Sequence, residues 1–101
     1  TRSFSYVDDT VNGIMLASSY KEPDIFNIGN DNEITINQLA QTIIDITNTK
    51  SKIIYKDLPK DDPLQRKPDL SKSKKLLNYE PVIGLEKGLE KTIEWVKKNI
   101  D

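Results

Sequence analysis

Arginine is scarce in this sequence, and its two positions are the first candidates for chemistry. Of the 15 basic residues, Arg2 and Arg66 are arginines and the others are lysines. A guanidinium group presents a rigid fork of donors that matches a phosphate or carboxylate, and it keeps its charge at physiological pH. Both positions therefore suit recognition of an anionic ligand. They suit equally well a structural salt bridge to an aspartate, or a clamp on backbone carbonyls.

Arg66 lies in the stretch KDDPLQRKPD, residues 60–69, in which prolines and acids stand on both sides of Arg66 and Lys67. One interpretation is a solvated loop. The other is a loop that its prolines stiffen, so that less conformational entropy is lost when the loop holds an anion. The two interpretations predict different surroundings for Arg66, and its position in the fold has to separate them.

Several other chemistries are excluded by residue types that the sequence lacks. It contains no cysteine and no histidine, which removes disulfides, thiolate nucleophiles, the commonest metal ligand and the usual general base near pH 7. Its glycines, at positions 13, 29, 84 and 88, do not form GxGxxG or GxxxxGK. No apolar run approaches the ~20 residues of a membrane span, so we expect no membrane contact by this segment.

The acidic residues do not indicate catalysis. Asp8–Asp9 and Asp61–Asp62 are adjacent pairs, whose side chains point apart on a helix or strand. We interpret them as residues that favour a helix start and solvate a loop. The net charge is −1. Acidic residues interrupt the basic stretch 60–75, and this stretch contains no aromatic residue. Nucleic acid is therefore not an expected partner.

Alternating strands and helices are predicted to position the two arginines. Hydrophobic periodicity predicts strands at 2–7, 25–28 and 52–56, and helices at about 7–18, 35–48, 69–77 and 84–100. This order, β-α-β-α-β-α-α, indicates an α/β fold with some parallel pairing. With 36% hydrophobic and 31% charged residues, we expect a single small domain, 1–101, with a modest core. We also expect contact with a neighbouring unit to help stabilise it.

Local signals define the helix ends. Thr35 with Gln38 forms a capping box, Asp69 is a predicted N-cap, and Asn78 is a predicted left-handed residue after the third helix. Gly88 lies inside the last helix, where it costs ~1 kcal/mol relative to alanine. We expect close packing against that glycine to compensate.

Several motifs in this order resemble the C-terminal part of the extended short-chain dehydrogenase/reductases, the NAD-dependent epimerases, dehydratases and decarboxylases of nucleotide sugars. They are TRSFSYVDDTVNGI, FNIGN, ITINQLAQTI, DDPLQRKPDLSKSKKLLNYEP and LEKGLEKTIEWV, and the resemblance covers essentially the whole chain. Within the family, DDPLQRKPD is most similar to the UDP-glucuronate decarboxylases, with a 4-epimerase or 4,6-dehydratase as the alternative. The chain departs from the family pattern at Asn78–Tyr79, where Gly-Trp is usual, and at Asp31, where Pro is usual.

The resemblance implies a small substrate-binding lobe that packs on a Rossmann domain outside this sequence. That domain would bind NAD and supply the Tyr-x-x-x-Lys pair, so the segment itself would contain no catalytic, cofactor-binding or metal-binding residue. Arg2 and Arg66 match family arginines that hold the UDP-sugar, Tyr6 matches an aromatic or histidine position near the site, and Lys67 is a weaker candidate.

The start at Thr1 rather than Met also fits a piece of a longer enzyme. The parent would be a homodimer, with a cytoplasmic or Golgi-lumen location left open. The alternative of another class is a non-catalytic scaffold module that keeps this fold.

Overall fold

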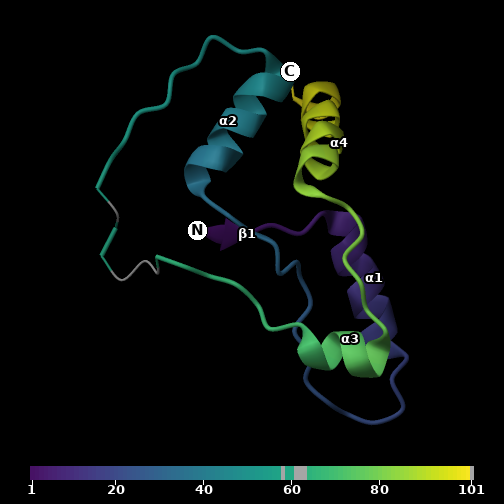
Figure 1. Cartoon of the computed structure of the whole chain (residues 1–101). Coiled ribbons are helices and arrows are strands. Elements are labelled where there is room, and N and C mark those ends of the chain that lie inside the picture. The colour runs from purple at the N-terminus through teal and green to yellow at the C-terminus, as the bar shows by residue number, and fades with distance from the viewer. Residues whose placement is uncertain (58, 61–63, 101) are drawn as a thin grey trace.

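A computed structural model of the chain describes residues 1–57, 59–60 and 64–100. Its elements are β1 (Arg2–Ser3), α1 (Val7–Ser18), β2 (Glu33–Ile34), α2 (Ile36–Thr47), α3 (Ser71–Leu77) and α4 (Leu85–Asn99). Helices α2 and α4 lie side by side at one end of the molecule, and α1 runs from there towards α3 at the other end (Figure 1). Residues 48–57 and 64–70 pass along one side between α2 and α3.

The predicted helices are confirmed, and their ends follow the local signals. At the start of α2 the Thr35 hydroxyl accepts a hydrogen bond from the Gln38 backbone N–H at 3.0 Å, and the Gln38 side chain accepts from the Thr35 N–H at 2.8 Å. Asn78 ends α3 in the left-handed region, with φ 56°. The N-cap of α3 is Leu70 rather than Asp69. Asp69 precedes the N-cap by one residue and still caps the helix start, because its carboxylate accepts hydrogen bonds from the Ser71 N–H and hydroxyl.

The predicted strands are largely wrong. Within the described residues the sheet has two strands, and they pair antiparallel with Arg2 opposite Ile34 and Ser3 opposite Glu33. The expected parallel pairing is therefore absent from the described chain, the first strand is shorter than predicted, and neither 25–28 nor 52–56 forms a strand there. The fold class remains α/β, in the order β-α-β-α-α-α.

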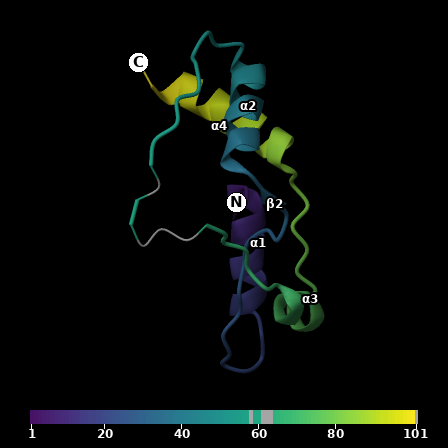
Figure 2. The ribbon, with the colours of Figure 1, turned by 60° about the vertical axis from the view of Figure 1, so that its left-hand side comes forward.

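The apolar run 25–28 contributes to the core without pairing as a strand. Phe26 and Ile28 pack against a buried cluster of Leu70, Leu77 and Tyr79, together with the side chains of Leu16, Ala17 and Tyr20. Short apolar runs are ambiguous because a strand and a buried loop give the same pattern. Here burial comes from side-chain packing against residues of α1 and α3 and the residues next to them. Figure 2 shows the backbone of α3 near the end of α1.

Glycines allow two close approaches that fix helix positions. A Cβ atom on Gly13 of α1 would lie 2.3 Å from Ile28 Cγ2 and 3.0 Å from Tyr79 Cε1. A Cβ atom on Gly88 of α4 would lie 3.3 Å from Tyr6 Cβ, which confirms the expected close packing at that glycine. These contacts place the start of α1 against α4 and the middle of α1 against the buried cluster.

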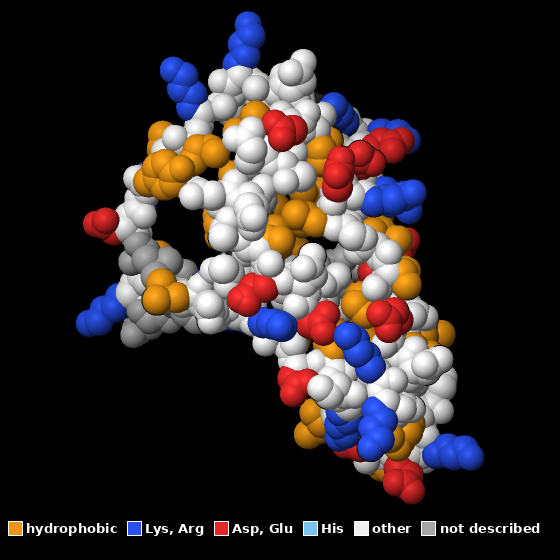
Figure 3. All heavy atoms as spheres, in the orientation of Figure 1, with side chains coloured by type: hydrophobic (Ala, Val, Ile, Leu, Met, Phe, Trp, Pro, Cys, Tyr) orange, Lys and Arg blue, Asp and Glu red, His pale blue; other side chains and the backbone are white. Residues whose placement is uncertain are grey.

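The molecule is extended for its length. Its radius of gyration is 16.2 Å and its principal extents are 50 × 35 × 20 Å, whereas a compact domain of 100 residues has a radius of gyration of about 13 Å. Apolar side chains are scattered over the face seen in Figure 3. None of the helices in the described ranges is both long and apolar enough to span a membrane.

Candidate functional site

Two segments that carry the arginines meet beside the sheet. The nitrogen of Thr1 donates a hydrogen bond to the Leu64 carbonyl oxygen at 2.6 Å, across 63 positions of sequence. Arg2 follows Thr1 and Arg66 lies two residues after Leu64, so both arginines lie close to this junction. The structure thus brings together the two segments that carry the residues singled out by composition alone.

Arg2 is held by the strand pairing and is half-buried. It pairs with Ile34 in the sheet, and its Nη1 donates to the Thr1 carbonyl oxygen at 2.7 Å. The neighbouring Thr1 hydroxyl donates to Glu33 Oε1 at 2.8 Å, which ties the start of β1 to β2. The backbone that carries Arg2 is therefore fixed by contacts on both sides.

Arg66 and Lys67 are both exposed. Within the described part of the chain, no hydrogen bond or ion pair of Arg66 is present, so its guanidinium is available at the surface. Of the surrounding KDDPLQRKPD stretch, residues 61–63 lie outside the described residues, including the predicted solvating pair Asp61–Asp62. Gln65 to Asp69 have no regular secondary structure, in agreement with the predicted loop.

Lys67 lines a shallow groove of about 370 Å³ together with Asp31, Pro68 and Lys74. Lys74 Nζ lies 3.0 Å from Asp31 Oδ2. This hydrogen bond, with smaller contributions from the positive charges of Lys74 and Lys67, lowers the pKa of Asp31, and the same pair raises the pKa of Lys74. Asp31 thus neutralises part of the positive charge on this face.

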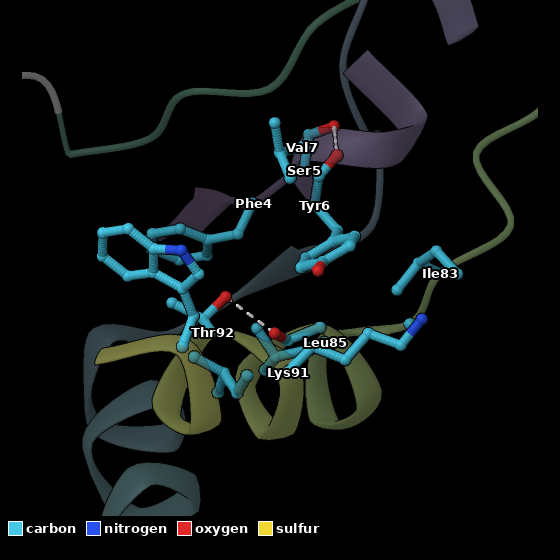
Figure 4. A pocket seen from close by; sticks show the side chains of 12 residues that line it. Phe4, Ser5, Tyr6, Val7, Ile83, Leu85, Lys91 and Thr92 are labelled. Carbon is cyan, nitrogen blue, oxygen red and sulfur yellow. Dashed lines mark hydrogen bonds between the residues drawn. The ribbon is translucent and has the colours of Figure 1, made fainter. Parts of the chain in front are cut away.

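Tyr6 lies on a different surface. It lines an apolar groove of about 480 Å³ between the β1–α1 connection and α4, where Figure 4 shows its ring facing Leu85 and Lys91. Lys91 Nζ lies 5.6 Å from the centre of the Tyr6 ring, a cation–π distance. Neither arginine is among the described residues that line this groove. The structure therefore joins the segment of Arg2 to the segment of Arg66 and Lys67, and Tyr6 lines a groove to which none of these three residues contributes.

Asp9 has a role that the sequence did not reveal. Asp8 and Asp9 both lie in the first turn of α1, as predicted, but Asp8 is exposed whereas Asp9 is buried. Its carboxylate accepts hydrogen bonds from the backbone N–H of Val82 at 3.1 Å and of Ile83 at 2.9 Å. It thereby fixes the segment that leads into α4. Its partners lie more than 70 residues away, so no local pattern could have identified them.

The described residues offer neither a metal site nor a dinucleotide site. No group of three or more potential acidic metal ligands gathers within them. Gly13 and Gly29 lie singly, and Gly84 and Gly88 lie one turn apart at the start of α4, so the four do not form a glycine-rich phosphate-binding loop. What the surface offers chemically is recognition of an anion by cationic side chains.

Comparison with known proteins places this arrangement in a family. No protein-family model matches the chain. It is 40% identical over all 101 residues to UDP-glucuronic acid decarboxylase 1 of Xenopus tropicalis, of which it covers 24%. It is 38% identical over 101 residues to UDP-glucuronate 4-epimerase of Thermodesulfobacterium geofontis (strain OPF15), matching 99% of this chain and 31% of that protein.

Solved structures give the same result. The fold matches UDP-glucose 4-epimerase of Thermotoga maritima, solved with UDP-glucose, with a TM-score of 0.90 and 34% identity over 98% of this chain and 32% of that one. Over its whole length the chain thus matches proteins of the extended short-chain dehydrogenase/reductase family, the epimerases and dehydratases. UDP-glucuronic acid 4-epimerase of Bacillus cereus, a member solved in complex with NAD, matches with a TM-score of 0.82 and 26% identity over 98% and 31% of the two chains. The 101-residue chain spans about a quarter of the length of the decarboxylase relatives that it matches.

Proposed function

We propose that this chain is the substrate-binding lobe, residues 1–101, of an NAD-dependent UDP-glucuronate decarboxylase that makes UDP-xylose. The observation that carries the proposal is the similarity to UDP-glucuronic acid decarboxylase 1 over every residue of the chain. The geometry supports it, because Arg2 and Arg66 lie on segments joined by the contact between Thr1 and Leu64.

The proposed role of the arginines follows from the charge of the ligand. The diphosphate of a UDP-sugar carries about two negative charges and glucuronate adds one, so a cationic surface is required. Arg2 is fixed by the sheet and Arg66 is available at the surface. Each charge-assisted hydrogen bond to the ligand would contribute ~1.5–3 kcal/mol. Lys67 would add a weaker, more distant charge.

The proposed role of Tyr6 is less direct. Tyr6 packs on Gly88 and lies under Lys91, in a groove separate from the arginines. Its place at the N-terminus of α1 makes it a residue that fixes the β1–α1 connection, and through it the strand that carries Arg2. We therefore propose that Tyr6 positions Arg2 and does not itself bind the diphosphate.

The cofactor does not fit this chain. NAD needs a glycine-rich loop at a helix N-terminus, and the glycines of the sequence do not form one. We infer that a Rossmann domain in the parent polypeptide binds NAD and performs the redox chemistry, and that the parent is a homodimer. The lobe alone would be catalytically silent and would contribute binding energy and orientation.

The alternative reaction is 4-epimerisation, which the resemblance to UDP-glucuronate 4-epimerase and UDP-glucose 4-epimerase favours. The parent enzyme, supplied with UDP-glucuronate and NAD, separates the two reactions through its products. Decarboxylation releases CO₂ and leaves a UDP-pentose, whereas epimerisation keeps the carboxylate. We expect CO₂ in proportion to the substrate consumed. Product that retains the carboxylate would replace our proposal with the epimerase, and no turnover of any UDP-sugar would favour a scaffold module.

A further inference from the structure

The motif FNIGN, residues 26–30, is held by side chains that come much later in the sequence. Ser73 Oγ donates a hydrogen bond to the Asn27 carbonyl oxygen at 2.5 Å, and the Tyr79 hydroxyl donates to the Gly29 carbonyl oxygen at 2.6 Å. Ser73 and Tyr79 are each 1% exposed, so little water competes for these bonds. The motif does not pair as a strand, and these side chains satisfy its carbonyl groups instead. Residues 26–30 therefore form a fixed platform beside α3.

The loop that carries Arg66 ends on this platform. Asn27 Nδ2 donates a hydrogen bond to the Asp69 carbonyl oxygen at 3.2 Å, across 42 positions of sequence. One residue earlier, the Pro68 ring lies against Gly29, since a Cβ atom on that glycine would be 3.6 Å from Pro68 Cγ. The side chain of Asn27 thus connects the platform to the backbone of the loop.

The other side of the loop is tied at Leu64, whose carbonyl oxygen accepts from the nitrogen of Thr1 at 2.6 Å. Residues 65–67 lie between the two ties and have no regular secondary structure. Within the described residues the Arg66 side chain makes no hydrogen bond, so its position depends on the backbone that carries it. Asn27 supplies one of the few contacts that fix this backbone.

We propose that Asn27 is a positioning residue for Arg66, which fixes the downstream end of the loop and so holds the guanidinium where the anionic ligand binds. The inference rests on the proposed function in taking a UDP-sugar as the ligand of Arg66. A loop that is ordered before binding loses less conformational entropy when the ligand arrives, which raises the affinity. Asn27 acts through Arg66 and makes no bond to the ligand.

Proteolysis of the parent enzyme without a nucleotide tests the contact between Asn27 and the loop. An arginine-specific protease cleaves after Arg66 at a rate that follows how often the loop leaves its docked position. Asn27→Ala should raise this rate about threefold, which is within the range for the loss of one hydrogen bond. Mass spectrometry identifies the cleaved bond.

The same motif offers a matched control, Asn30→Ala. The Asn30 side chain accepts a hydrogen bond from the Asn32 backbone N–H at 2.8 Å, which stays within the turn. This substitution should leave the cleavage rate after Arg66 unchanged. Because Asn27 and Asn30 are at least partly exposed, both variants should fold, and an unchanged Tm of the parent verifies this. Cleavage of Asn27→Ala at the wild-type rate would overturn the proposal.

A double-mutant cycle tests whether Asn27 acts through Arg66. In calorimetric titrations of the parent enzyme with UDP-glucuronate, Asn27→Ala should raise Kd about threefold when Arg66 is present. It should leave Kd unchanged in an Arg66→Ala background, because the side chain that it positions is then missing. Equal weakening in both backgrounds would overturn the proposal, since a general loss of structure gives that result.

The two measurements separate this proposal from the proposed function. An Arg66→Ala enzyme with an unchanged Kd would contradict the binding role of Arg66, and the cleavage rates would still decide whether Asn27 fixes the loop. Weak binding by Arg66→Ala, together with wild-type cleavage and wild-type Kd for Asn27→Ala, would refute positioning by Asn27 and leave the proposed function in place.

Discussion

The two ends of the molecule differ in how their helices are held. Around Tyr79, the buried side chains Leu70, Ser73 and Leu77 interlock with the end of α1, and Tyr79 itself is 1% exposed. At the other end, α2 has no buried residue and α4 buries Gly88 alone among its fifteen residues. We call these the packed end and the open end.

The difference separates two sources of stability. The packed end is held by tertiary contacts, including the hydrogen bond from the Tyr79 hydroxyl to the Gly29 carbonyl at 2.6 Å. The open end relies on local signals, such as the capping box of α2, and on contact between α2 and α4. The segment with Arg66 connects the two ends, where few contacts restrain it. Binding segments are often drawn from such weakly held regions of a protein.

The largest effect on stability is expected from filling the close approach at the packed end. Gly13→Val would place atoms within 2.3 Å of Ile28 Cγ2, a methyl group that cannot swing away, and should lower the free energy of unfolding by about 3 kcal/mol. Gly29→Ala is the control, since its Cβ would meet Pro68 at an ordinary 3.6 Å. Urea unfolding measures both, and a Gly13→Val protein as stable as the control would show that the packed end is loose.

A smaller loss is expected from removing one buried hydrogen bond. Tyr79→Phe keeps the ring but leaves the Gly29 carbonyl without its donor, which should cost about 1.5 kcal/mol in the same unfolding experiment. Tyr55→Phe should have no effect, because Tyr55 is 75% exposed. Equal effects of the two substitutions would contradict the assignment of Tyr79 to the core.

At the open end, the cap of α2 should contribute less. Thr35→Ala removes the acceptor for the Gln38 N–H and should destabilise the protein by about 1 kcal/mol, while Thr35→Ser keeps the hydroxyl and should restore most of that loss. Helix content followed by circular dichroism during urea unfolding tests this. A loss of stability larger than that of Tyr79→Phe would mean that the contacts of the open end contribute more to stability than those of the packed end.

The smallest effect concerns the ion pair between Asp31 and Lys74. The lowered pKa of Asp31 means that the pair stabilises the folded state above the ordinary value of 3.8, and that this contribution is lost as pH falls through the lower folded-state pKa. Lys74→Met should therefore lower the urea midpoint slightly at about pH 6, and by a smaller amount at a pH well below the ordinary pKa of 3.8. Because both side chains are more than a third exposed, added salt should reduce the difference. A difference that persists undiminished at the lower pH would rule out the charge as its cause.

Local signals predicted the helices, and non-local contacts explain the failures. The capping box of Thr35 and the left-handed Asn78 depend on neighbours within four residues, so they were readable from sequence. Residues 52–56 look like a strand, yet Ile54 and Tyr55 are about three-quarters exposed, without a partner in the described chain. Pairing depends on what lies alongside, which the local pattern does not contain.

The candidate site was also predictable only in part, because some of its features are local in the sequence and others depend on distant residues. Arginine scarcity identified Arg2 and Arg66, and the contact between Thr1 and Leu64 brings their segments together. The buried role of Asp9 depends on Val82 and Ile83 and was missed. The two departures from the family motifs also found partners: Tyr79 bonds to Gly29, and Asp31 pairs with Lys74. Both lie outside the arginine segments.

Calorimetric titration of the parent enzyme with UDP-glucuronate tests the central claim most directly, namely that Arg66 binds the nucleotide sugar. Arg66→Ala should raise Kd at least about tenfold, equivalent to ~1.4 kcal/mol, and Arg66→Lys should lie between it and the wild type because the charge remains without the fork. Lys97→Ala, on the solvated last turn of α4, is the control and should leave Kd unchanged. An Arg66→Ala enzyme that binds UDP-glucuronate as tightly as the wild type would contradict the account.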